Sequence, residues 1–189
     1  MLASGAHEQE LQRLLLILDV DETLVHASES RLSRECDFLL GPYFIYERPH
    51  LRPFLARMHR CCDLAIWSSG GQDYVQGIVG RLFENLPFAP LFAWDARRCS
   101  SRFDGESHSK FVIKNLKKVK RRGFSLSRTL IVEDTPSKVS LNYGNAIYVS
   151  SYQGAADDAE LLALARFIES LCDCPDVRRI EKRRSAANW

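Results

Sequence analysis

The chain has 189 residues, of which 46% are apolar and 26% charged, and its formal net charge is +2. This length suits one α/β domain with a real core and excludes two large domains. The balanced charge gives no sign of a nucleic-acid partner. No membrane span is expected, because the apolar run Leu14–Leu18 is far shorter than the roughly 20 residues such a span needs.

The six cysteines form no CxxC pair, and none has a histidine at zinc-site spacing. Cys172 and Cys174 are too tightly spaced for an ordinary disulfide or a zinc knuckle. We therefore expect reduced thiols and a cytoplasmic location, or a nuclear one if the source is a eukaryote.

Residues 1–12 read as a polar N-terminal extension, and the first buried strand follows at 13–18. A short, wholly apolar run of this kind is typical of a parallel strand covered on both faces. Asp19, Asp21 and Thr23 come directly after it. Two carboxylates this close repel each other, so one pKa rises unless a cation lies between them. The pair indicates a divalent metal, an acid–base role, or both, although an Asp-x-Asp pair alone is as common in loops and helix caps.

Residues 27–48 form a small insertion after this strand. The polar stretch 27–35 predicts a loop, and residues 37–46 predict a β-hairpin whose two arms flank the Gly41-Pro42 turn. An amphipathic helix is expected next, near 51–60.

Strands and helices then alternate along the chain. We predict strands at 63–67, 91–94, 129–132 and 146–149, and helices at 72–84, 136–141 and 157–171. Residues 95–109 predict a loop with room for a minor hairpin, and residues 111–122 predict an extended piece followed by a lysine-rich helix. This alternation indicates a parallel sheet with right-handed crossovers. The expected domain is 13–171, followed by a charged C-terminal tail at 172–189.

Polar residues stand at the ends of three of these strands. Ser68 and Ser69 follow the second strand, and Glu133 and Asp134 follow the strand at 129–132. In a doubly wound sheet such strand ends converge at one edge, where ligands bind. Lys110 or Lys114 lies between these groups in the sequence. A carboxylate nucleophile, an acid, a hydroxyl, a lysine and a metal carboxylate together suit phosphoryl transfer to a carboxylate.

Four segments resemble the motifs of the haloacid dehalogenase (HAD) superfamily, in the right order. Asp19–Val25 resembles motif I, Trp67–Gly70 motif II, Lys114 motif III and Glu133–Pro136 motif IV. Residues 111–116 favour Lys114 over Lys110 for motif III, although Asn115 stands where the family pattern has an aspartate.

Within the superfamily, residues 21–26, 48–50 and 133–136 resemble the C-terminal-domain phosphatase branch, also called NLI-interacting-factor-like. The likeness covers about residues 13–171. It implies a Rossmann-like parallel sheet flanked by helices, with a small hairpin insertion and no large cap.

The resemblance also implies a role for each matching residue. Asp19 would attack phosphorus and become an aspartyl phosphate, and Asp21 would protonate the leaving group and then activate water. Mg²⁺ would be held by Asp19, Asp134 and the backbone carbonyl of Asp21. Ser68 would contact the phosphoryl oxygens, and Lys114 would neutralise the phosphoaspartate. Supporting positions would be taken by Thr23, Ser69 and Glu133.

The substrate is the open question at this stage. The absence of room for a large cap favours a phosphorylated protein or peptide, with phosphoserine or phosphothreonine as the expected target. In the resembling branch, the insertion and a tyrosine after motif II line a pocket, for which the residues here would be Phe38, Leu40, Phe44, Tyr46 and Tyr74. The hairpin could equally just cover an edge of the core. A small-metabolite phosphatase and a phosphoprotein-binding scaffold with little turnover remain the alternatives.

Overall fold

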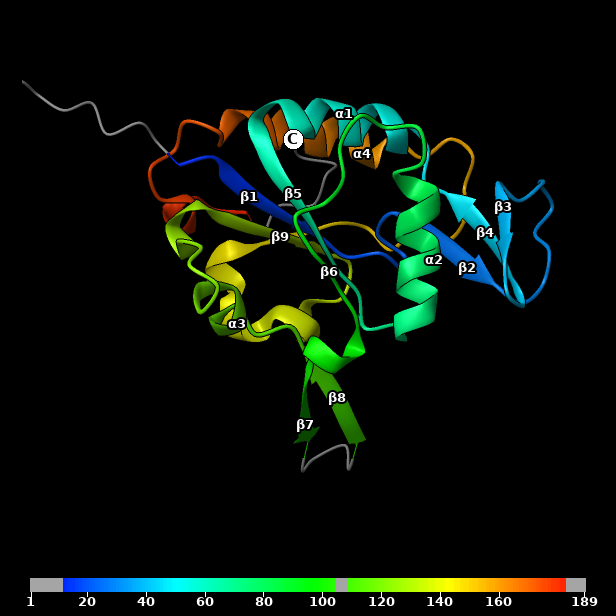
Figure 1. The fold of residues 1–189 in the computed structure, drawn as a ribbon, viewed down its shortest axis with the longest axis horizontal. Coiled ribbons are helices and arrows are strands. Elements are labelled where there is room, and N and C mark those ends of the chain that lie inside the picture. The colour runs from blue at the N-terminus through cyan, green and yellow to red at the C-terminus, as the bar shows by residue number, and fades with distance from the viewer. Residues whose placement is uncertain (1–11, 105–108, 183–189) are drawn as a thin grey trace, which may run out of the picture.

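A five-stranded, wholly parallel sheet forms the centre of the computed structural model, which describes residues 12–104 and 109–182 (Figure 1). Its strand order is β10-β9-β1-β5-β6. The strands are β1 (Leu14–Leu18), β5 (Cys62–Trp67), β6 (Ala93–Trp94), β9 (Thr129–Glu133) and β10 (Ala146–Tyr148). The α/β class and the flanked parallel sheet predicted from the alternation of elements are confirmed.

The central strand β1 is buried on both faces, as its unbroken apolar run requires. Its even positions, such as Leu16, pack into one core layer with α1 (Leu51–Cys61) and α4 (Glu160–Ser170). Its odd positions, such as Ile17, face a second layer with α3 (Lys117–Lys120). In Figure 1 α1 and α4 lie side by side over one face of the sheet. Both helices present a buried apolar stripe to the sheet, which fixes them there.

The insertion after β1 folds into a three-stranded antiparallel sheet of order β2-β4-β3. The strands are β2 (Val25–Ser28), β3 (Phe38–Leu40) and β4 (Tyr43–Glu47). The predicted hairpin is confirmed, with Gly41 at a φ of +57° in its turn. The expected loop at 27–35 is shorter than predicted, because Ala27 and Ser28 pair with β4. The minor hairpin expected within 95–109 involves β7 (Ser100–Asp104), which pairs with β8 (Ser109–Ile113).

Two predicted helices differ from the structure, and tertiary contacts explain both differences. The helix expected at 136–141 is a run of 3₁₀ turns over Pro136–Asn145, with non-helical backbone at Val139 and Asn142. The Asn142 side chain instead donates to the Lys114 carbonyl at 2.9 Å. The last helix begins at Glu160 rather than 157, because the Asp158 carboxylate accepts the Glu160 N–H at 3.0 Å.

The chain beyond α4 packs back on the domain as far as residue 182. Val177 is fully buried, and the guanidinium of Arg128 donates to the carbonyls of Cys172 and Cys174 at 2.7 and 2.5 Å. The first part of the predicted tail therefore lies against the core, whereas the N-terminal extension up to residue 11 and the tail from 183 fall outside the described residues. The domain boundaries stay predictions. Among the described residues, no helix has the length and apolar character to cross a membrane.

Arg48 ties the insertion to the helical layer through a buried ion pair. Its side chain is 0% exposed, and its guanidinium donates to both carboxylate oxygens of Asp158 at 2.8 Å and to the Thr23 carbonyl at 3.1 Å. Replacing Arg48 by methionine leaves the Asp158 carboxylate without its partner charge and the buried Thr23 carbonyl without this donor, so we expect the free energy of unfolding to fall by about 3 kcal/mol. Chemical denaturation measures this loss.

The matched control is Arg57→Met, because Arg57 pairs with Glu169 on the surface, where the two side chains are 33% and 37% exposed. An exposed pair contributes less than about 1 kcal/mol. If the free energy of unfolding fell equally in the two variants, the buried pair would contribute no more to stability than the exposed pair.

Candidate active site

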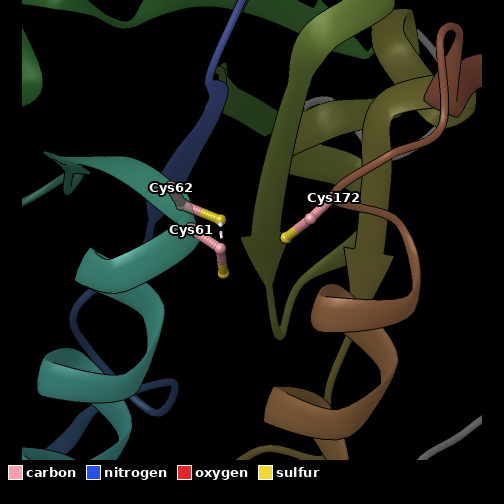
Figure 2. A group of neighbouring side chains, drawn as sticks. All are labelled: Cys61, Cys62 and Cys172. Carbon is pink, nitrogen blue, oxygen red and sulfur yellow. Dashed lines mark hydrogen bonds between the residues drawn. The ribbon is translucent and has the colours of Figure 1, made fainter. Parts of the chain in front are cut away.

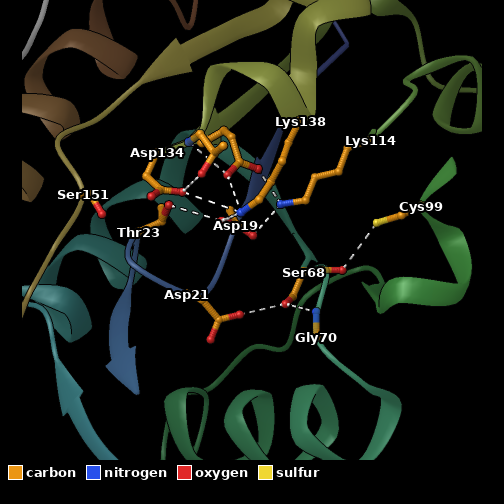
Figure 3. Close-up of polar contacts among 12 residues, drawn as sticks. Asp19, Asp21, Thr23, Ser68, Gly70, Cys99, Lys114, Asp134, Lys138 and Ser151 are labelled. Atoms are coloured by element: carbon orange, nitrogen blue, oxygen red, sulfur yellow. Dashed lines mark hydrogen bonds and ion pairs between the residues drawn. The ribbon is translucent and has the colours of Figure 1, made fainter. Parts of the chain in front are cut away.

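The carboxyl-terminal edge of the parallel sheet brings the predicted site residues together (Figure 3). Asp19 follows β1, Ser68 follows β5 and Asp134 follows β9. Lys114 follows β8 and reaches the same place from the neighbouring hairpin. Hydrogen bonds fix this edge locally, since the Asp19 N–H binds the Val132 carbonyl at 3.1 Å and the Ser68 N–H binds the Trp94 carbonyl at 2.9 Å. The convergence expected for a doubly wound sheet is therefore observed.

Lys114 is a fully buried cation held between two buried carboxylates. Its Nζ donates to Asp19 Oδ1 and, at 2.6 Å, to Glu133 Oε2. Burial alone would lower the pKa of Lys114, but the charges of Asp19 and Glu133 outweigh it and raise that pKa. Lys110, the alternative considered for this position, is exposed on β8 opposite Phe103. Of the two lysines considered from the sequence, Lys114 is thus the one that lies in the site.

Asp19 is buried yet held in its ionised form. Burial opposes the charge, but Lys114 and then Lys138 offset the burial, so the pKa of Asp19 lies below its ordinary value. Its second oxygen, Oδ2, accepts a long hydrogen bond of 3.5 Å from the Thr23 hydroxyl. An ionised carboxylate at a strand end, with one oxygen anchored by a lysine, is suited to nucleophilic attack by the other.

Asp21 lies in a different environment, two residues away. The Ser68 hydroxyl donates to its Oδ2 at 3.1 Å and the Tyr74 hydroxyl to its Oδ1 at 2.5 Å. Figure 3 shows its side chain pointing toward Ser68 and away from Asp134. Burial raises the pKa of Asp21, and the charge of Asp19 adds to this, while the two hydroxyl groups partly offset it. The environments of Asp19 and Asp21 push their pKa values apart, which is the pattern of a nucleophile beside a general acid.

On the side away from Asp21, the Asp19 carboxylate forms a cluster with the carboxylates of Glu133 and Asp134. One oxygen each of Asp19, Glu133 and Asp134 lies within 4.8 Å of the others. Both Glu133 oxygens already accept hydrogen bonds, from Lys114 at 2.6 Å and from Lys138 at 3.2 Å. Burial, with the nearby charge of Asp19, raises the pKa of Glu133 despite these lysines. Three carboxylates this close together are stabilised by a bound cation, and their oxygen donors suit a hard divalent ion.

Lys138 is the site residue that the sequence analysis missed. Its Nζ lies 3.7 Å from Asp19 Oδ2, 3.2 Å from Glu133 Oε1 and 3.8 Å from Asp134 Oδ1. These carboxylates raise the pKa of Lys138 against the opposing effect of burial. The available signal was its spacing of four residues from Asp134, which would place the two side chains on one face of a helix. The predicted helix, however, began only at Pro136.

The remaining supporting residues have simpler surroundings. Thr23 is buried beside Asp19, and Ser69 is half-buried next to Ser68. The Gly70 N–H donates to the Ser68 hydroxyl at 2.8 Å. Ser68 therefore has its acceptor position filled by backbone while its proton points to Asp21.

The five predicted pocket residues do not share one accessible surface. Phe38 and Tyr46 are buried, and the Tyr46 hydroxyl accepts the Leu32 N–H at 2.8 Å. These two are corrected to core positions of the inserted sheet. Half-buried side chains remain at Leu40, Phe44 and Tyr74. Tyr43, which was not predicted, packs edge-on against the Tyr74 ring at 5.9 Å between centroids.

Comparison with known proteins places this chain in one family. The model of the NLI interacting factor-like phosphatase family matches residues 14–178. The chain is 27% identical over 181 residues to nuclear envelope morphology protein 1 of Saccharomyces cerevisiae, covering 87% of this chain and 40% of that protein. It is 28% identical over 182 residues to human carboxy-terminal domain RNA polymerase II polypeptide A small phosphatase 1, covering 91% and 64%. The chain thus spans only part of the length of these relatives.

A solved structure shows the same fold. The fission yeast RNA polymerase II CTD phosphatase Fcp1, bound to beryllium fluoride, superposes with a TM-score of 0.57 at 17% identity, covering 91% of this chain and 58% of Fcp1. The family model extends over most of the chain, and the motif residues meet at one sheet edge. The chain belongs to the NLI interacting factor-like phosphatase family, the C-terminal-domain phosphatase branch of the HAD superfamily.

Proposed function

We propose that this chain hydrolyses phosphomonoesters through an aspartyl phosphate on Asp19, with Mg²⁺ as its cofactor. The observation that carries the proposal is the contrast between two neighbouring carboxylates. Lys114 and Lys138 hold the pKa of Asp19 low, whereas burial raises the pKa of Asp21. One group is thereby prepared to attack and the other to carry a proton.

The carboxylate cluster fits Mg²⁺. Asp19 and Asp134 would hold the ion, together with the backbone carbonyl of Asp21, while Glu133 stays one step back because lysines already bind both of its oxygens. This set offers few carboxylates and leaves positions for phosphate oxygen and water, as Mg²⁺ prefers. The ion would offset the repulsion between the attacking carboxylate and a dianionic phosphate.

The side chains then divide the reaction between them. Asp19 attacks phosphorus, and Asp21 gives its proton to the leaving alkoxide. In the second step Asp21 takes a proton from the water that hydrolyses the aspartyl phosphate. Ser68, oriented by the Gly70 N–H, turns its proton from Asp21 to a phosphoryl oxygen, and Lys114 balances the charge on the phosphorylated Asp19.

We propose a phosphoserine or phosphothreonine side chain of a protein as the substrate. Within residues 12–104 and 109–182 the additions near the sheet edge are the small β2-β4-β3 sheet and the β7-β8 hairpin, and neither is a large cap that could enclose a metabolite. The relatives named as phosphatases of the RNA polymerase II carboxy-terminal domain support a protein substrate. A cytoplasmic or nuclear location stays a prediction.

A comparison of two substrate classes tests this proposal. With Mg²⁺ present, we expect kcat/KM for phosphoserine and phosphothreonine peptides to exceed that for sugar phosphates and nucleotides by at least about tenfold, since flanking residues add binding contacts. The Asp19→Asn variant is the blank. A preference for a small phosphate would support the metabolite phosphatase, and tight phosphopeptide binding without phosphate release would support the scaffold.

The position of Lys138 favours the alternative of a scaffold with little turnover, because this lysine lies where the catalytic metal ion would bind. This yields a prediction. Its ammonium sits within 3.8 Å of all three carboxylates, where it competes with a divalent ion. Replacing Lys138 by methionine should lower the Mg²⁺ dissociation constant by at least about tenfold, which corresponds to the loss of one opposing charge at short range. Calorimetric titration without substrate measures this.

The control for this variant is Lys120→Met, which removes an exposed lysine from α3 and should leave Mg²⁺ affinity unchanged. An unchanged or higher dissociation constant in Lys138→Met would show that Lys138 does not compete for the metal position.

A further inference from the structure

The adjacent residues Cys61 and Cys62 lie beside Cys172, which is distant in the sequence (Figure 2). The three cysteines lie at the end of the sheet opposite to the active site. Cys61 ends α1, Cys62 begins β5, and Cys172 follows α4. Their sulfur atoms all lie within 4.8 Å of one another, and the Sγ atoms of Cys61 and Cys62 are 3.7 Å apart. Since Cys62 starts the strand whose far end leads into Ser68, this thiol cluster is separate from the active site.

The spacing of the sulfur atoms suits a thiolate-bound metal. Zinc–sulfur bonds of about 2.3 Å in tetrahedral geometry place the sulfur atoms about 3.8 Å apart. The Cys61–Cys62 pair is already at that distance, and Cys172 needs a shift of no more than about 1 Å. A disulfide between Cys61 and Cys62 is disfavoured, because consecutive Cα atoms are about 3.8 Å apart and disulfides need about 4.4–6.8 Å.

The electrostatic surroundings also suit an anionic sulfur cluster. Arg13 donates to the Cys62 carbonyl at 2.8 Å, and the largely buried Arg128 donates to the Cys172 carbonyl at 2.7 Å. Arg13 is already paired with Asp63, so the Arg128 guanidinium is the group that would offset the net charge of −1 that three thiolates and a divalent ion carry. Without a metal, burial and the neighbouring thiols raise the pKa of Cys62. Cys62 therefore needs a cation at its sulfur to ionise.

The exposure of the three cysteines and their sulfur donors indicate which kind of metal ion the cluster can bind. Cys61 and Cys172 are half-buried, so an ion can reach the cluster, while Cys62 is fully buried and anchors it. All three donors are sulfur, which selects soft cations and excludes the Mg²⁺ expected at the carboxylates. We propose that Cys61, Cys62 and Cys172 form a zinc-class metal site that ties the α1–β5 junction to the end of α4.

Titration of the reduced protein with Cd²⁺ tests the site, because cadmium bound to thiolate gives an ultraviolet charge-transfer band that carboxylate ligands do not give. We expect one Cd²⁺ per chain, release of about three protons, and protection of three of the six cysteines from alkylation. With free Zn²⁺ at 100 times its dissociation constant, the midpoint of thermal unfolding should rise by up to about 5–10 °C.

Matched serine variants decide the outcome. Cys61→Ser and Cys172→Ser, both at half-buried positions, should weaken Cd²⁺ binding by more than about 100-fold and remove the thermal shift. Cys36→Ser changes a half-buried thiol of the insertion and should alter neither. The proposal is overturned if the reduced protein binds no stoichiometric Cd²⁺, if the two serine variants bind it as well as the parent, or if two of the thiols are already joined in a disulfide under reducing conditions.

Discussion

Replacing Asp19 by asparagine removes turnover, with an expected loss in kcat of at least about 10⁴-fold. The amide cannot attack phosphorus, and no other described carboxylate occupies the same place: Asp21 points toward Ser68, and Glu133 is engaged by two lysines. Phosphate release from p-nitrophenyl phosphate and from a phosphopeptide, each with Mg²⁺, measures the loss.

The same variant should stay folded. Lys114 keeps its 2.6 Å hydrogen bond to Glu133, and the oxygen of the isosteric amide can still accept the hydrogen bond that Asp19 Oδ1 accepts from Lys114, so the buried ammonium keeps both partners. We therefore expect the thermal unfolding midpoint to change little. The control is Asp63→Asn, which alters an exposed aspartate at the other end of β5 and should keep full activity. Substantial activity in Asp19→Asn would rule out this residue as the nucleophile.

Replacing Asp21 by asparagine should slow both chemical steps, by about 10²–10⁴-fold for an alkyl phosphate. The leaving alkoxide then receives no proton, and water receives no base. With p-nitrophenyl phosphate the first step survives, because nitrophenolate leaves without a proton. The phosphorylated protein should accumulate, giving a burst of nitrophenol equal to the enzyme present and an acid-stable, hydroxylamine-labile label.

The pH dependence of the parent enzyme follows from the same residue. Burial raises the pKa of Asp21, so its protonated form, which serves as the acid, persists to higher pH than in a free aspartate. The rate of the first step should fall as pH rises through that pKa. The Asp21→Asn variant should lack this descending limb, whereas an unchanged profile would assign the acid role to another group.

The sequence predicted the parts of the site that depend on local pattern. The apolar run of β1 leading into Asp19 and Asp21, and the polar residues after β5 and β9, located the sheet edge correctly because parallel strands end together. Lys138 was missed because residues 136–141 were expected to form a regular helix, whereas the Pro136–Asn145 segment forms 3₁₀ turns whose course is decided by tertiary bonds to Lys114.

Contacts between distant segments could not be predicted. The Arg48–Asp158 pair joins residues 110 positions apart, and the thiol cluster brings Cys172 to Cys61 and Cys62. The sequence spacing predicts neither the ion pair nor the thiol cluster, because both arise from the packing of α1 beside α4 on the sheet. The burial of Tyr46 likewise follows from the pairing of β2 with β4. This pairing was not predicted, because residues 27 and 28 were expected to belong to a loop.

The central claim is that phosphate passes through Asp19, and one measurement tests it directly. The Asp21→Asn protein is mixed with p-nitrophenyl phosphate and Mg²⁺, quenched in acid during the burst, digested, and sequenced by tandem mass spectrometry. We predict one phosphoryl group, located on Asp19 and lost on treatment with hydroxylamine. A phosphoryl group on another residue such as Ser68, or none on the protein while nitrophenol is released in a burst, would contradict it.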